Sequence, residues 1–543
     1  MIFVYRPALS GPFEFDDGHS IRDNQAIHDL HNVIGVFTSA KYSTTMPVNW
    51  SYRPVTTFSN MLLWQVANGS PVPFRVFKLV VFILMGILLV RIWKILLPKV
   101  PEVILFAAIS LFAVNPVNTE VLIYVSASST LLAGFFSVLA LWLYLLYRRE
   151  LRVVWLALSL LSYFTATMAK EEGIAAYAFI VFIELYLRQT DGKRLLDLSL
   201  LKTAVLYLIP CGLDLLLFSQ MYESTQLISR AQVTTLQYFI TQWRAWLRYV
   251  VMYFVPYDLN SDNLNFGFNY SLKERVVLFS LLGNIILLAG SILLWRRRKP
   301  IFLFALMCFY AGVSPASSVV RLAEPVNDHR AFLGYMGFSV VSVWLLNWLW
   351  SYQKSVCKVV IAGVAVSYCA GTRIRAETYS NGEKFWRDVV AKNPSHARAR
   401  NNLGVELMAQ ARYKEALEEI RVCIRLQDNY ANCYINAAIV AAALGDDAEA
   451  EKNFNLGIQY DNFIVLSRSF YAQFLIARGD VTKALKLLEE CDQFTHGLDL
   501  DVRVWMVTAL VKMGDENRAA AVIRDSMKTF GRNPRIVPAD FPD

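Results

Sequence analysis

The sequence is poor in charged residues, which make up only 18% of its 543 residues, whereas 55% are hydrophobic. A soluble domain would carry roughly 25% charged residues. The shortage is concentrated in residues 74–372, where apolar runs approach the roughly 20 residues that cross a bilayer. The tail from Arg373 onward has ordinary polarity. A wholly soluble protein is therefore excluded, and an integral membrane protein with a water-soluble tail is expected.

Cysteine is also sparse, with seven residues and no Cys-X-X-Cys pair. This spacing argues against a zinc site or a disulfide framework, although Cys423 and Cys433 could pair across neighbouring helices. The first residues, MIFVYRPALSGP, contain too short an apolar run for a signal peptide.

The net charge of +9 does not indicate nucleic-acid binding, because Lys and Arg cluster at the ends of the apolar runs. Such clusters are typical of cytoplasmic loops. About ten spans are predicted: 74–97, 101–117, 119–147, 151–169, 173–188, 199–220, 275–295, 301–320, 331–350 and 356–372.

The positive-inside rule places the basic loops in the cytoplasm. The N-terminal segment, the loops 115–120, 170–172 and 321–330, and the C-terminal tail then lie outside. Residues 236–256 do not fit a full crossing, because it would move the Arg-rich loop at 296–299 outside. Arg244 and Arg248 in this segment favour an interfacial or re-entrant helix.

The tail is repetitive. Ala416, Ala450, Ala484 and Ala519 follow one another at intervals of 34, 34 and 35 residues, and each lies five residues after Ala411, Gly445, Gly479 or Gly514. Gly404, Ala438 and Ala472 also repeat every 34 residues. This period, with small residues where helices cross, predicts tetratricopeptide repeats.

Two predicted outer loops near the N-terminus carry candidate site residues. Asp16 and Asp17 are adjacent carboxylates with His19 nearby, and such a pair can supply a general base; a solvated turn is the alternative. Arg53, before Pro54, suits phosphate binding, although its spacing alone favours an anchor at the membrane interface.

Further candidates lie in three later outer loops, which carry Glu120, the triplet Lys170, Glu171 and Glu172, and the group Arg321, Glu324, Asp328, His329 and Arg330. Ionisable residues between apolar runs are costly unless they face a cavity or one another. A shallow external hairpin is the alternative for 170–172. Acids and arginines on one side suit a transferase that accepts a lipid-phosphate donor and activates a hydroxyl.

The ordered motifs FEFDD, YRP, NPVNTE and KEEG, an Arg-led aromatic stretch and the repeats resemble one family across essentially the whole chain. It is the transmembrane and tetratricopeptide repeat-containing O-mannosyltransferases, with their bacterial relatives, in the GT-C glycosyltransferase superfamily. The resemblance implies inverting transfer of a mannose-like sugar from a polyprenyl phosphate to a protein hydroxyl.

The resemblance also implies residue roles. Asp16 or Asp17 would be the general base, and Arg53 and Arg330 would bind the lipid phosphate. The remaining candidates for substrate binding are Glu120, Lys170, Glu171 and His329. No metal ligand is assigned, and a divalent metal remains an open possibility.

The expected fold class is all-α, with a polytopic GT-C-type domain followed by a tetratricopeptide α-solenoid. The expected parts are an outer first loop (1–73), a transmembrane domain (74–372) and a repeat domain (373–543). The repeats would hold the acceptor polypeptide on the periplasmic side of a bacterial inner membrane. The alternatives are a non-enzymatic scaffold that recruits envelope or pilus assembly partners and, more weakly, a transporter.

Overall fold

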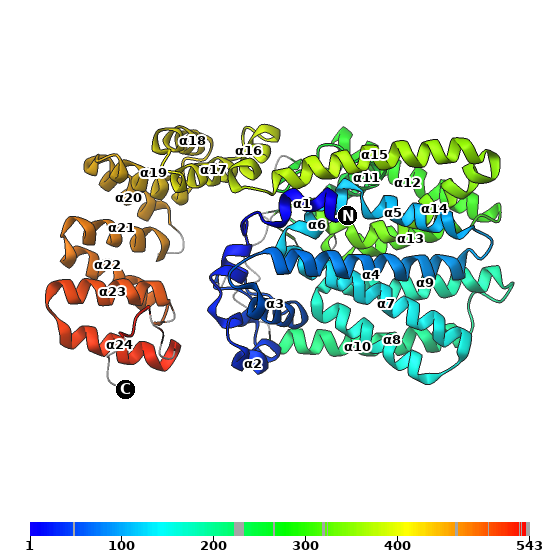
Figure 1. The fold of residues 1–543 in the computed structure, drawn as a ribbon, viewed down its shortest axis with the longest axis horizontal. Helices are drawn as coiled ribbons and strands as arrows, with labels where there is room; N and C mark the ends of the chain where they lie inside the picture. The colour runs from blue at the N-terminus through cyan, green and yellow to red at the C-terminus, as the bar shows by residue number, and fades with distance from the viewer. Residues whose placement is uncertain are drawn as a thin grey trace. The chain divides into compact units, whose positions relative to one another are not determined.

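All regular structure in the described part of the chain is helical, which agrees with the expected fold class (Figure 1). The computed structural model describes residues 1–543 except 47–48, 222–232, 264–265, 318–320, 323, 462–464, 498, 531–532, 534 and 539–543. The chain forms two compact units, Met1–Lys392 and Asn393–Asp543.

The first unit is a bundle of long apolar helices with shorter helices at one end (Figure 1). Its α-helices are α1 (Ile2–Leu9), α2 (Val33–Thr38), α3 (Pro54–Ala67), α4 (Val72–Leu96), α5 (Glu102–Ala113), α6 (Thr119–Ile123), α7 (Ser128–Glu150), α8 (Val153–Ala169), α9 (Ala175–Thr190), α10 (Leu198–Met221), α11 (Thr235–Phe254), α12 (Arg275–Arg296), α13 (Ile301–Val313), α14 (Phe332–Tyr352), α15 (Lys354–Thr378) and α16 (Gly382–Lys392).

Helices occupy all ten ranges predicted to span a membrane. Within the described residues, however, only six helical segments are long and apolar enough to cross, or seven if the bent pair α5 and α6 counts as one. The 17 residues of α8 and the 13 of α13 fall short of the roughly 20 that a crossing needs. The protein is a multi-pass membrane protein, but length and composition support fewer spans than the ten predicted.

The predicted boundary between the second and third spans is wrong in detail. Residues 102–123 form two helices bent by 55°, and the long helix α7 begins only at Ser128. Pro116 explains the break, because the residue before a proline avoids helical geometry. Asn115 caps the new turn by accepting the Val117 N–H at 3.2 Å.

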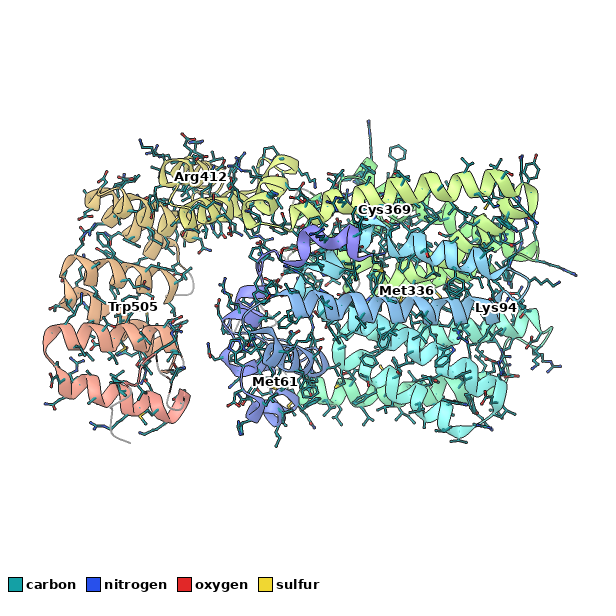
Figure 2. All side chains as sticks on the ribbon, in the orientation of Figure 1. Met61, Lys94, Met336, Cys369, Arg412 and Trp505 are labelled. Carbon is teal, nitrogen blue, oxygen red and sulfur yellow. A yellow bond between two sulfur atoms is a disulfide. The ribbon has the colours of Figure 1, made fainter. Side chains whose placement is uncertain are left out.

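The loops of the first unit gather at two ends. Met61 of α3 and Lys94 near the end of α4 lie at opposite ends of the bundle (Figure 2). We call the end with α3 the site end and the end with Lys94 the basic end. Contacts between the ends of separate helices join the basic end: Arg148 of α7 lies 3.2 Å from Asp191, which follows α9, and Trp295 of α12 donates to Gln189 of α9 at 2.6 Å.

Helix α11 covers the range predicted to be interfacial or re-entrant, and it is not one of the six segments suited to span. Its N-terminus is a capping box formed by Thr234 and Gln237. Arg244 is half-buried and donates to the Gly267 carbonyl at 2.9 Å, while its guanidinium lies 3.8 Å from the Phe266 ring centroid. Arg244 therefore holds the following loop, and the placement of α11 in a membrane remains a prediction.

The first unit ends at Lys392, twenty residues beyond the predicted limit of 372. The end of α15 and residues of α16 contact the rest of the first unit: Arg375 donates to the Ser261 hydroxyl at 2.5 Å, and the Trp386 ring lies 5.8 Å from that of Phe15. Arg375 lies 2.7 Å from Asp388, and the Lys392 amine donates to the Leu259 carbonyl at 2.6 Å. Polar contacts of this kind are not visible in a hydropathy pattern.

The second unit consists of paired helices, as the repeat period predicts. They are α17 (Ala397–Ala409), α18 (Tyr413–Leu426), α19 (Ala431–Ala443), α20 (Asp447–Tyr460), α21 (Val465–Arg478), α22 (Val481–Phe494), α23 (Leu500–Met513) and α24 (Glu516–Phe530).

The small residues that repeat every 34 positions lie where the paired helices touch. Ala416, Ala450 and Ala484 are fully buried, and a Cβ on Gly404 would come within 2.7 Å of Ile420. The residues between the paired helices, including Gly445 (φ +84°) and Gly479 (φ +91°), adopt the left-handed conformation that favours glycine.

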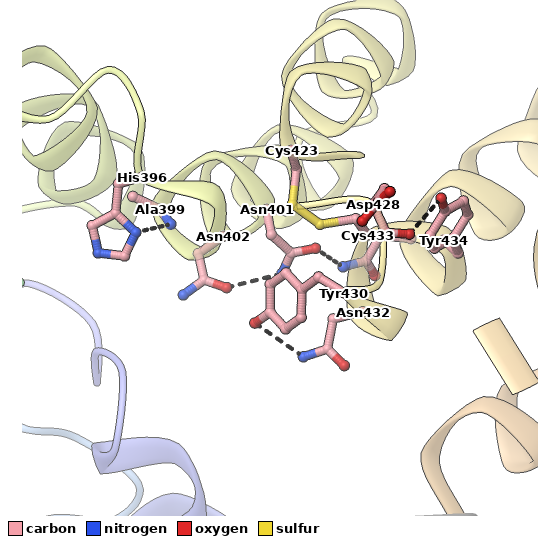
Figure 3. The surroundings of a disulfide bond; sticks show 11 residues. His396, Ala399, Asn401, Asn402, Cys423, Asp428, Tyr430, Asn432, Cys433 and Tyr434 are labelled. Atoms are coloured by element: carbon pink, nitrogen blue, oxygen red, sulfur yellow. Dashed lines mark hydrogen bonds between the residues drawn. A yellow bond between two sulfur atoms is a disulfide. The ribbon is translucent and has the colours of Figure 1, made fainter. Parts of the chain in front are cut away.

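A disulfide joins Cys423 of α18 to Cys433 of α19, as the sequence allowed (Figure 3). Their Cα atoms are 6.1 Å apart, and both side chains are fully buried. Beside it, Asn436 donates to Asn401 at 2.8 Å across adjacent repeats. The disulfide therefore links the first helix pair, α17 and α18, to the next pair, α19 and α20.

Candidate functional site

Asp16 and Asp17 have different surroundings although they are neighbours in the chain. Asp17 is fully buried and accepts hydrogen bonds from the Ser126 N–H at 2.7 Å and the Ser126 hydroxyl at 2.6 Å. Burial raises the pKa of Asp17, and the Ser126 hydroxyl and the Arg75 charge oppose that shift. Asp17 thus anchors the first loop to the start of α7.

The Asp16 side chain remains 41% exposed. Its N–H donates to the Tyr124 hydroxyl at 3.1 Å, and its Oδ1 lies 3.2 Å from His19 Nε2. The other ring nitrogen of His19 lies 2.6 Å from the Thr44 hydroxyl, which orients the imidazole. Asp16 is therefore oriented by neighbours yet open to an incoming group.

Two buried cations near the start of α4 hold the acidic loop, and the sequence analysis missed them. Arg75 donates to the carbonyls of Pro12 at 2.6 Å and Ile123 at 3.0 Å, and to that of Gly11. Lys78 donates to the Tyr124 carbonyl. The sequence feature that could have identified them is a pair of cations three residues apart within an apolar run, because a charge in such a run requires partners inside the protein.

Arg53 and Glu171, assigned separately to substrate binding, form a bidentate pair. The Arg53 Nε and Nη2 atoms donate to the two Glu171 oxygens at 3.0 and 2.7 Å. Burial by itself would raise the pKa of Glu171, but the charges of Arg53 and Lys170 outweigh it and lower the pKa to about 2. The guanidinium fork of Arg53 is thus already occupied by a carboxylate.

Lys170 is buried beside Glu172, with 3.0 Å between Nζ and the carboxylate, and it donates to the Thr130 hydroxyl at 2.9 Å. Burial lowers the pKa of Lys170, and Glu172 opposes the shift. Lys170 and Glu172 are therefore packed into the bundle, which does not fit the alternative of a shallow external hairpin, whereas Glu171 is exposed.

Glu120 and His329 meet although 209 residues separate them, with 2.9 Å between the Glu120 carboxylate and His329 Nδ1. Arg330 is part-exposed and donates to the Glu324 carbonyl at 2.6 Å. The structure thus brings together Glu120, His329, Arg330 and Lys170, whose charges act on one another.

Several carboxylate oxygens at this end lack hydrogen-bond partners. Glu120 Oε2, Glu172 Oε2 and Asp328 Oδ1 are buried and have none within the described structure. Buried acceptors are costly without donors, so a hydroxyl-rich ligand would suit this end. In the described residues, no group of three or more His, Cys, Asp or Glu is arranged to hold a metal ion.

The architecture and the site define a multi-pass membrane protein whose ionisable loops meet at one end of a helical bundle and whose chain continues into helical repeats. Its curated homologues are protein O-mannosyl-transferases, as the sequence resemblance indicated. The mouse TMTC3 protein is 22% identical over 505 residues, which cover 83% of this chain and 53% of that protein. A Caenorhabditis elegans protein O-mannosyl-transferase is 24% identical over 268 residues, which cover 48% of this chain and 37% of the relative.

The human TMTC3 protein is 26% identical over 194 residues, which cover 34% of this chain and 20% of that protein. The chain therefore spans about half the length of the mouse relative and less of the other two. No family model matches the chain.

Two similar solved structures have low scores. One, described as functional characterization of Pseudomonas aeruginosa pilF, gives a TM-score of 0.24 at 15% identity and covers 36% of this chain and 92% of that one. The other, the Cut9–Hcn1 hetero-tetramer of APC/C, gives 0.27 at 10% identity and covers 80% and 81%.

Proposed function

We propose that the chain is a membrane glycosyltransferase that moves a mannose-like sugar from a polyprenyl phosphate to a protein hydroxyl outside the cytoplasm. The homology to protein O-mannosyl-transferases supports the class of reaction. The observation that carries the mechanism is the division between a buried Asp17 and an exposed Asp16. A GT-C-type fold and an inverting course belong to the same proposal.

Asp16 is the general base in this mechanism. It takes the proton of the acceptor hydroxyl while the acceptor oxygen attacks C1 of the sugar from the face opposite the phosphate. The bond between C1 and the phosphate oxygen breaks, and the lipid phosphate leaves with the electron pair. General-base help of this kind contributes roughly 100-fold or more to the rate.

Arg330 is the best candidate for stabilising the departing phosphate. Within the described residues its guanidinium donates to a main-chain carbonyl, whereas Arg53 is engaged by both oxygens of Glu171. Positive charge placed where negative charge develops is commonly the largest contribution to such a transfer. Glu120 and His329 would orient the sugar. The nearby carboxylate oxygens that have no hydrogen-bond partner within the described residues would accept hydrogen bonds from the sugar hydroxyls.

The repeat unit would bind the acceptor polypeptide and lie outside the cytoplasm with the site end. The disulfide between Cys423 and Cys433 supports this placement, because disulfides persist in oxidising compartments. A bacterial inner membrane remains the expected location.

The test replaces each carboxylate separately. Asp16→Asn should lower transfer from polyprenyl-phosphate mannose to an acceptor protein by about 100-fold or more, with unchanged thermal stability in detergent. Asp17→Asn should instead lower stability by about 1–3 kcal/mol, because a buried hydrogen-bonded charge is lost. It should also retain more activity per folded molecule.

Wild-type activity in Asp16→Asn would remove the proposed base. A chain with no transferase activity that still binds partner proteins through its repeats would favour the scaffold.

A further inference from the structure

The basic end carries a groove that has no part in the proposed transfer. It measures about 260 Å³ and lies between α9, α12 and α13. Nine of its ten lining residues are apolar or aromatic, and the tenth, Gln189, accepts from Trp295 Nε1 at 2.6 Å. This bond fixes the indole as one wall, while the rings of Tyr186 and Phe304, 5.5 Å apart, form another part.

The groove borders α12, which the rest of the bundle leaves largely uncovered. Only 17% of the apolar stretch of α12 is buried inside the protein, so most of that helix faces lipid. Trp295, near the end of α12, is an amphipathic residue of the kind enriched where a membrane meets water. The groove would thus extend from the hydrocarbon layer of the surrounding membrane to the level of its lipid headgroups.

A cationic rim borders the groove at that level. Arg296, Arg297, Arg298 and Lys299 lie between two lining residues, Trp295 and Pro300, at the end of α12 and in the following turn, and all four are exposed. A second basic pair, Lys193 and Arg194, directly precedes the lining residue Leu195.

The nearby acids pair with Arg148, Lys193 and Arg188 rather than with the arginines of residues 296–298. Asp191 lies 3.2 Å from Arg148 and 3.8 Å from Lys193, and Asp197 lies 2.6 Å from Arg188. In the described part of the chain, Arg296, Arg297 and Arg298 have no ion pair. Three exposed guanidinium groups beside an apolar groove match a ligand with a phosphate head and an apolar tail.

We propose that this groove is a binding site for an anionic phospholipid. One acyl chain lies between α9 and α13, and the phosphodiester lies against the 296–299 turn. Basic pockets between transmembrane helices are suited to anionic headgroups, and each added cation strengthens the attraction. The site is at the end of the bundle opposite Asp16, so it is separate from any donor site there.

The experiment measures lipid retention by the purified full chain in detergent, using native mass spectrometry with palmitoyl-oleoyl phosphatidylglycerol or phosphatidylcholine. We expect phosphatidylglycerol to be retained at least about fivefold more strongly. The triple variant Arg296→Gln/Arg297→Gln/Arg298→Gln should abolish that preference. The matched variant Arg91→Gln/Arg149→Gln/Lys358→Gln, which removes three exposed cations elsewhere, should keep it.

A groove variant tests the tail. Leu303→Trp fills the groove without changing charge, and it should weaken retention of phosphatidylglycerol while transferase activity persists. Equal retention of the two lipids by the wild type would overturn the proposal. It would also be overturned if the matched variant lost the preference for phosphatidylglycerol as completely as the triple variant does, because the preference would then reflect general attraction of the lipid to surface cations. Normal binding by Leu303→Trp, with glycerol phosphate displacing the lipid, would reduce the site to an anion site and also overturn it.

Discussion

At the scale of single residues, side chains of the same type have different surroundings, and this decides which of them can take part in chemistry. Asp17 is surrounded by hydrogen-bond donors of residues 125–126, whereas Asp16 keeps an exposed carboxylate. Arg53 pairs with Glu171 through two of its three guanidinium nitrogens, whereas Arg330 donates to a main-chain carbonyl. Partners, rather than residue type, decide which of these groups remains available for chemistry.

The two arginines should therefore respond differently to substitution by Lys, which retains the charge but not the planar fork. We expect Arg330→Lys to weaken polyprenyl-phosphate binding by about tenfold, a loss of about 1.4 kcal/mol. Arg53→Lys should weaken it less, because Glu171 already engages the Arg53 fork. Binding in nanodiscs, with Arg149→Lys as the control, measures both. A larger loss in Arg53→Lys would reverse the assignment.

The Arg53–Glu171 pair has a defined pH dependence. The pKa of Glu171 is about 2 in the folded chain, below its ordinary 4.5, so the pair stabilises the fold fully above pH 4.5. That contribution is lost as the pH falls from 4.5 towards 2. It should be below about 1 kcal/mol, because the Glu171 side chain is 58% exposed.

Thermal unfolding in detergent can detect this effect. The advantage of the wild type over Glu171→Gln should be constant between pH 7 and pH 5 and should shrink at lower pH. An advantage that grows as the pH falls would contradict the sign of the shift.

At the scale of elements, the turns inside the repeats follow one rule with one exception. Gly445, Gly479 and Gly514 adopt positive φ angles, and the equivalent position in the first repeat is Ala411, with φ +58°. A left-handed conformation costs a residue with a Cβ roughly 1–2 kcal/mol, and the greater freedom of unfolded glycine offsets part of this.

Ala411→Gly should therefore stabilise α17 and α18 by about 0.5–1 kcal/mol, and Gly445→Ala should destabilise α19 and α20 by a similar amount. Nothing lies within 4 Å of a Cβ at Gly445, so backbone strain alone would act. Hydrogen exchange on the full chain, followed over residues 397–460, measures both variants. Faster exchange in Ala411→Gly would show that this turn does not limit opening.

At the scale of the whole molecule, the proposed function requires the repeat unit to be outside the cytoplasm. A reporter fused after Asp543 should then read as periplasmic, or as lumenal in a eukaryotic cell. In the denatured chain, Cys423 and Cys433 should react with maleimide only after reduction, because they are paired and, when folded, fully buried. Cys423→Ser, which frees Cys433, is the control for labelling. A cytoplasmic reporter signal would contradict the orientation and the proposed role of the repeats.

The sequence by itself determined the fold class and the approximate positions of the long apolar helices and of the repeats. Apolar runs of bilayer length and a period of 34 residues are properties of neighbours along the chain, so they can be recognised without a structure. The repeated Ala and Gly residues lie at helix contacts and turns as that period predicts. The candidate loops were also recognisable, because ionisable residues between apolar runs need a reason to be there.

Only the tertiary structure decided how those residues are used. Glu120 and His329 meet across 209 residues, Arg53 meets Glu171 across 118, and Arg75 is buried among carbonyls of the first loop. Whether Asp16 or Asp17 is exposed depends on Ser126, which no local pattern near the acidic pair reveals. Burial and pairing are set by segments distant in the chain, and Asp16 remains available for chemistry because those segments leave its carboxylate exposed.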